Sequence, residues 1–91
     1  MMSVHLDRAK ALQKEIQKIL IEEWDPIGVG DIPEAEHEYD SYVPELYKML
    51  ISRKPKHEIF EYIWWLETEH MGLTGDRQRS EMFAERLYNL A

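Results

Sequence analysis

The pattern of apolar and polar positions predicts four helices and no strand-like alternation of useful length. Over residues 4–24 the apolar positions recur at helical spacing, which is typical of a long helix with one buried side. Pro26 and Gly28 follow closely and should end this first helix. Its apolar stripe consists of Ala9, Leu12, Ile16, Ile19, Leu20 and Trp24.

A second helix should begin near Asp40 or Ser41, because both residue types are good N-caps. Pro44 then falls within the first turn, the part of a helix that tolerates proline. Residues 52–55 break the chain and begin a third helix, which should run to about His70.

The third helix is apolar almost all round, since only Glu61 is polar between Ile59 and Leu66. A helix of this kind is either central in its bundle or shares a face with another chain. Two interpretations remain open. The bulky aromatic side chains cover a thin core, or they form a homodimer contact through Trp64 and Trp65.

Gly72 should take the left-handed position at the end of the third helix, with Leu73 packing back. Thr74 or Asp76 should then cap a fourth helix whose inward residues are Phe83, Leu87 and Leu90. The sequence therefore predicts one all-α domain over residues 1–91, a small bundle of four helices with a long, structured, acidic loop between the first two.

The connection over residues 25–38 is long for a compact domain, and loops of this length are often functional or disordered. We expect the apolar residues of its first half to anchor it onto the core, and the Asp25 carboxylate to cap or brace it through nearby N–H groups. Its second half, residues 34–38, should be mobile or form a short helical turn. The apolar anchors would be Ile27, Val29 and Ile32.

Charge is unevenly distributed along the chain. Residues 19–47 contain no Lys or Arg and hold nine of the 18 acidic residues, whereas the remaining residues carry 11 basic and 9 acidic groups. This segment therefore accounts for the net charge of −7, a value that argues against nucleic acid as a ligand. A concentrated acidic surface with aromatic residues should steer and contact a basic protein partner. We expect Tyr42 on the core side and the contact surface to comprise Asp25, Asp31, Glu36, Glu38, Tyr39, Asp40 and Tyr47.

Composition places the chain among soluble globular proteins, with 44% hydrophobic and 32% charged residues. Cysteine is absent, which favours a reducing compartment, and no apolar signal segment follows the N-terminus. The longest apolar run, residues 62–66, is far shorter than the roughly 20 residues that span a bilayer. We therefore expect a cytoplasmic protein without membrane contact.

The metal-binding patterns in the sequence are incomplete. A window from Asp25 to Glu36 resembles a calcium loop, but Ile27 and Val29 occupy positions that need oxygen donors. The spacing Glu-x-x-His occurs twice, ending at His37 in the loop and at His70 at a helix end, which does not make a two-metal bundle site. We expect no cofactor. The alternative function is a small-ligand or divalent-metal-binding protein that uses the acidic loop and His37.

No catalytic arrangement is evident either. Ser41 near His37 is the only pair that resembles a nucleophile with its base, and no oxyanion loop accompanies it. The glycines Gly28 and Gly30 are followed by Asp31, whose charge would repel phosphate. The sequence thus favours a protein that is not an enzyme.

Three segments carry a resemblance to a known family. Residues 23–29 (EWDPIGV), residues 38–44 (EYDSYVP) and residues 69–73 (EHMGL) resemble a family of small bacterial all-α proteins to which no activity is assigned. The resemblance covers about residues 20–73 and implies a short bacterial helical protein whose first loop is a designed feature. In size, acidity and helical architecture the chain is also similar to bacterial immunity proteins that neutralise basic nuclease toxins, although none of their motifs is present.

Overall fold

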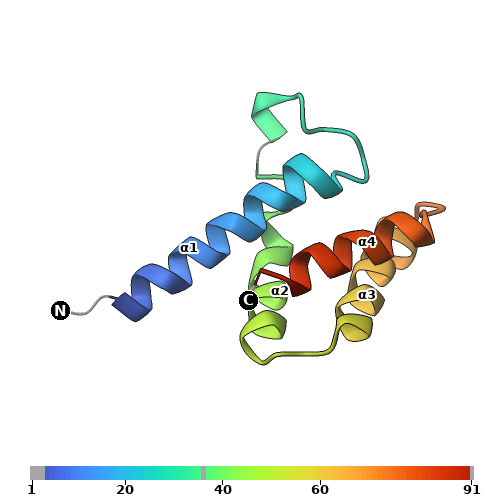
Figure 1. Cartoon of the computed structure of the whole chain (residues 1–91). Coiled ribbons are helices and arrows are strands. Elements are labelled where there is room, and N and C mark those ends of the chain that lie inside the picture. The colour runs from blue at the N-terminus through green and yellow to red at the C-terminus, as the bar shows by residue number, and fades with distance from the viewer. Residues whose placement is uncertain (1–3, 36, 91) are drawn as a thin grey trace. The chain divides into compact units, whose positions relative to one another are not determined.

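The computed structural model describes residues 4–35 and 37–90, and side chains among them from residue 8 onward. Four α-helices and several short helical turns make up the described part, which contains no strand. The α-helices are α1 (Val4–Ile19), α2 (Val43–Ile51), α3 (Lys56–Trp65) and α4 (Arg77–Tyr88) (Figure 1). This confirms the all-α fold class and the number of helices that the apolar spacing predicts.

The chain divides into two compact units, Met1–Tyr47 and Lys48–Ala91. The boundary falls within the residues of α2. The prediction of one domain over residues 1–91 therefore stays a prediction.

In the first unit, the predicted stripe of α1 is buried from Ile16 onward, whereas Ala9 and Leu12 are half-buried. Ile16, Ile19 and Leu20 are almost fully buried, and so is Trp24 at the end of the helix. The last turn, Leu20–Trp24, is a wider π-helical turn, because the Asp25 N–H donates to the Leu20 carbonyl oxygen at 2.9 Å. The helix ends where Asp25 takes the left-handed conformation, with φ 34°.

The loop after α1 contains a short 3-10 turn, Pro33–Ala35, and a second one, Asp40–Tyr42, leads directly into α2. Pro44 lies in the first turn of α2, as expected. The expected N-cap is wrong, however, because no side chain caps the 3-10 turn that precedes this helix. The Asp40 carboxylate instead contacts Gln17 and His37.

In the second unit, α3 and α4 pack along each other (Figure 1). The inner stripe of α3 consists of Ile59, Ile63 and Leu66, which are all at most 1% exposed. From α4 the buried apolar residues are Phe83, Ala84 and Leu87. These two sets form the apolar core of this unit.

One polar contact accompanies this core. The Ser80 hydroxyl of α4 lies 2.8 Å from both carboxylate oxygens of Glu67, and both residues are buried. Glu67 belongs to the π-helical turn Leu66–His70 that extends α3. A buried carboxylate needs such a hydrogen bond, because an unsatisfied one is costly.

The helix ends of this unit follow the predicted chemistry. Gly72 has φ 72°, and the Leu73 N–H bonds to the Glu67 carbonyl oxygen at 2.8 Å, one residue wider than in a Schellman motif. Asp76 caps α4 by accepting a hydrogen bond from the Arg79 N–H. After α2 the left-handed position is occupied by Arg53, with φ 59°.

The aromatic residues of α3 form two stacked pairs. Phe60 stacks on Trp64 with ring centroids 5.9 Å apart, and Tyr62 stacks on Trp65 at 6.3 Å. Trp64 is closely approached by Gly75, where an added Cβ would lie 2.9 Å from the indole. Trp65 is 48% exposed, so of the two tryptophans in the possible homodimer contact it is the one with the larger exposed surface.

Candidate functional site

Asp25 is the centre of a hydrogen-bond network that shapes the first half of the acidic loop. Its Oδ1 accepts bonds from the Val29 N–H and the Tyr39 hydroxyl, both at 2.8 Å, and its Oδ2 accepts the Gly30 N–H at 2.8 Å. The expectation that this carboxylate braces the loop through nearby N–H groups is therefore confirmed. We call Asp25, Tyr39 and the two amide groups the Asp25 network.

Gly30 is required by the close approach of this network. A Cβ at this position would lie 2.8 Å from the Asp25 Oδ2 and 2.9 Å from the Ile21 carbonyl oxygen. The second distance involves the backbone of the helical turn, which cannot move aside like a side chain. Gly28 serves a different purpose, since its φ is 70° and an added Cβ would meet nothing within 4 Å.

Tyr39 is a structural residue rather than a contact residue. Its side chain is only 2% exposed, and its ring packs on Trp24 with centroids 5.3 Å apart. Burial, together with the hydrogen bond to Asp25, raises the pKa of its hydroxyl well above the usual value. The expectation that Tyr39 lies on the contact surface is corrected for this reason: the ring seals the loop against the end of α1.

Tyr42 completes this aromatic cluster, as expected for a core-side residue. It is half-buried, and its ring lies 6.1 Å from Trp24 and 6.3 Å from Tyr39. Burial, and to a smaller extent the charge of Glu38, raises the pKa of its hydroxyl. Trp24, Tyr39 and Tyr42 therefore join the end of α1 to the start of α2.

A second polar cluster joins the loop to the middle of α1. The His37 Nδ1 lies 2.6 Å from the Asp40 Oδ2, and the Gln17 side-chain nitrogen lies 2.9 Å from the same ring atom and 3.4 Å from that oxygen. The side chains of His37 and Asp40 remain 70% and 42% exposed. Asp40, His37 and Gln17 therefore form one polar contact between the loop and α1.

The apolar residues of the loop do not anchor it as expected. Ile27 is 43% exposed and Ile32 is 47% exposed, while Val29 is half-buried. The Asp25 network supplies the anchorage instead, because the Tyr39 hydroxyl accepts a hydrogen bond from the Ile27 N–H and the Asp25 carboxylate accepts one from the Val29 N–H. Two large aliphatic side chains are thereby left facing solvent on an acidic loop.

The remaining acidic residues of the loop lie at the surface. Asp31, Glu34 and Glu38 are exposed, and within the part of the chain that the structure describes none of the three carboxylates forms an ion pair. Glu36 lies outside the described residues, and Tyr47 is half-buried in α2. The predicted site residues are therefore split between the surface (Asp31, Glu38 and part of Asp40) and the loop's own support (Asp25 and Tyr39).

The structure locates the metal-ligating and nucleophilic side chains of the described residues. Over residues 4–35 and 37–90 no group of three or more His, Asp or Glu side chains could hold a metal ion. Ser41 is exposed and makes no hydrogen bond to His37, whose ring contacts Asp40 and Gln17. Ser80, the serine that does contact a carboxylate, is buried with Glu67.

Sequence reasoning missed three features of this site. Gln17 carried no signal, because a glutamine on a polar helix face has many possible roles. The exposure of Ile27 and Ile32 was not predicted, because large apolar residues in a loop are more often packed onto the core. The bond between Asp25 and Tyr39 was also missed, because the two residues are 14 positions apart in the sequence. Rules for hydrogen bonds between near neighbours in the chain do not apply at that separation.

No family model, curated protein or solved structure matches the chain. The resemblance of its three segments to a bacterial family therefore stays a prediction, and so does the likeness to immunity proteins. Among the helices that the structure describes, none is both long and apolar enough to cross a bilayer.

Proposed function

We propose that this chain is a non-enzymatic protein-interaction module whose acidic loop recognises a basic protein partner. The observation that carries the proposal is the combination of three exposed, unpaired carboxylates with two exposed isoleucines on one braced loop. We call this set the loop surface. It consists of Ile27, Asp31, Ile32, Glu34 and Glu38.

Charge and apolar contact have different roles in such recognition. Exposed carboxylates attract a basic surface over about a Debye length, ~8–10 Å at moderate salt, and so raise the rate of association. Ile27 and Ile32 would be buried in the complex, and each such burial contributes about 1.5–3 kcal/mol. Loop bracing by Asp25 lowers the entropy lost on binding.

A toxin-neutralising role is one concrete form of this proposal, because a nuclease toxin presents a basic surface to such an inhibitor. The absence of cysteine supports a cytoplasmic location, where partner and module would meet. For the divalent-metal alternative through His37, the described residues contain no group of three or more His, Asp or Glu side chains that could hold an ion.

The proposal is tested by capture experiments with charge-matched variants. The full chain is immobilised and used to recover partners at low and moderate salt, beside the triple variant Asp31→Asn/Glu34→Gln/Glu38→Gln. The control Glu15→Gln/Glu61→Gln/Glu69→Gln removes the same charge from exposed positions elsewhere. A specific partner should be basic, should be retained by the control, and should leave as salt rises.

For the recovered partner, association kinetics separate the two contributions. The triple variant should associate about tenfold more slowly at low salt, since rim charges mainly affect the association rate. The variant Ile27→Ser/Ile32→Ser should instead dissociate faster, because apolar contacts are lost. Equal binding by the triple variant and its control would contradict the proposal, as would a partner whose binding does not respond to salt.

A further inference from the structure

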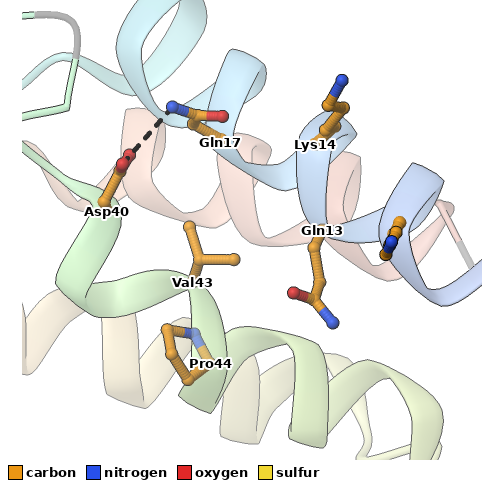
Figure 2. A pocket seen from close by; sticks show the side chains of 7 residues that line it. Gln13, Lys14, Gln17, Asp40, Val43 and Pro44 are labelled. Carbon is orange, nitrogen blue, oxygen red and sulfur yellow. Dashed lines mark hydrogen bonds between the residues drawn. The ribbon is translucent and has the colours of Figure 1, made fainter.

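A groove separates α1 from the first turn of α2, inside the unit Met1–Tyr47. Its volume is about 350 Å³, within the range of small-molecule sites. Figure 2 shows Val43 pointing from α2 towards α1, with Pro44 one residue further along the same helix. Gln13 points from α1 into the space between the two helices, and Gln17 turns towards Asp40 at one end.

The α1 side of the groove is positively charged. Lys10 and Lys14 line it, and Lys18 continues the same row of the helix at the next interval of four. Like charges at this spacing repel, and among the described side chains none of the three amines forms an ion pair. In a chain of net charge −7, this is a local excess of positive charge beside an apolar surface.

The opposite end of the groove is acidic, because Asp40 lies there with Gln17 and His37. Lys10 and Gln17 are seven residues apart, so the two ends are separated by about 10 Å along the helix axis, at roughly 1.5 Å per residue. A ligand with one negative charge can place it near the lysines and away from Asp40. A second negative charge would meet the Asp40 carboxylate, and a cation would meet the lysines.

We propose that this groove binds a small amphiphilic monocarboxylate with an unbranched apolar tail. The carboxylate would pair with Lys10 and Lys14, which line the groove and whose long, flexible side chains can turn towards a bound anion. The tail would lie across Val43 and Pro44 towards Asp40 and would replace water on that surface. The Gln13 amide offers a hydrogen bond to the ligand's head group.

This site is independent of the loop surface. None of Ile27, Asp31, Ile32, Glu34 and Glu38 lines the groove. The triple carboxylate variant should therefore bind the small ligand normally, and loss of either activity would leave the other intact.

The probe is octanoate, titrated into the full ¹⁵N-labelled chain and followed by amide chemical shifts. Saturable shifts should map to the side-chain amides of Gln13 and Gln17 and to the backbone around Val43. In a series of butyrate, hexanoate and octanoate, each added methylene that reaches the groove should tighten binding about fourfold, the equivalent of ~0.8 kcal/mol per CH₂. Octylamine, with the same tail and opposite charge, should not bind here.

Charge variants complete the test. Lys10→Gln/Lys14→Gln should weaken octanoate binding about tenfold, in line with two exposed ion pairs. The control Lys18→Gln/Lys48→Gln removes the same charge from exposed positions outside the groove and should leave binding unchanged. All four lysines are exposed, so each variant should fold, which circular dichroism verifies.

Several results would overturn the proposal. These are octylamine binding as tightly as octanoate, equal weakening in both lysine variants, and no saturable shift. Shifts centred on Phe60 and Met82 would also overturn it. These two residues line a separate groove of about 490 Å³ between α3 and α4, in which Lys56 and Arg77 already form ion pairs with acidic residues.

Discussion

Single residues of the loop differ sharply in what they contribute, and Asp25 shows why. Its carboxylate could be predicted to accept loop N–H groups, because Asp commonly does so within a few residues. Its bond to Tyr39 could not, because it depends on the loop closing back over 14 residues. Tyr39 was misassigned for the same reason. A tyrosine beside acidic residues has the composition of a contact surface, and only the fold shows that its ring is buried.

Gly30→Ala tests the close approach in the Asp25 network. The added Cβ would clash with the Asp25 carboxylate and the Ile21 carbonyl, so we expect the free energy of unfolding to fall by about 1–3 kcal/mol. Hydrogen exchange at the Val29 and Gly30 amides should accelerate with it. Gly28→Ala is the matched control, since it strains the backbone by about 1 kcal/mol without a clash. Unchanged protection of these amides in Gly30→Ala would contradict the network.

Tyr39→Phe tests the buried hydroxyl through the pH dependence of stability. The pKa of Tyr39 is raised in the folded chain, so the unfolded chain loses its phenolic proton first, above pH about 10. The stabilisation that comes from the raised pKa of Tyr39 is therefore fully present below pH about 10. It is lost as the pH rises towards the pKa that Tyr39 has in the folded chain. Urea unfolding from about pH 8 to about pH 11 should therefore show a shallower alkaline decline in the variant, with the remainder due partly to Tyr42. Parallel declines would refute this account.

At the scale of whole elements, the spacing of apolar residues and the Pro, Gly and capping residues at helix ends predicted the helices well. The stripe of α1, the proline in the first turn of α2 and the Asp76 cap all follow from local rules. The widened turns that end α1 and α3 do not follow from them, because a π-helical turn differs from an α-helical one by a single hydrogen-bond shift.

The end of α2 provides a prediction at this scale. Arg53 occupies a left-handed position that glycine favours, while the Lys54 N–H bonds to the Met49 carbonyl oxygen at 3.0 Å as in a Schellman motif. We expect Arg53→Gly to raise the free energy of unfolding by about 0.5–1 kcal/mol, measured by chemical denaturation. Gly72→Ala, at the corresponding position after α3, should lower it by a similar amount. If Arg53→Gly instead lowers the free energy of unfolding, the arginine side chain stabilises the fold by more than its left-handed backbone conformation destabilises it.

At the scale of the whole molecule, the exposed aromatic surface of α3 predicts self-association. Trp65 is 48% exposed and stacks between Tyr62 and His70, which makes it the aromatic residue of α3 best placed to meet a second copy. Sedimentation should show a reversible dimer that Trp65→Ser weakens. Met82→Ser, which removes another exposed apolar side chain, serves as the control. A monomer at all concentrations would leave Trp65 as a surface aromatic only.

The Asp25 network has a consequence for how this loop can change. Its conformation depends on one carboxylate, one phenol and two glycine positions, none of which needs to touch a partner. The outward side chains at positions 27, 31, 32 and 34 can accordingly be exchanged while the backbone path is kept. The chain thus offers an adaptable scaffold, in which new specificities could be selected from a small library of substitutions at these four positions.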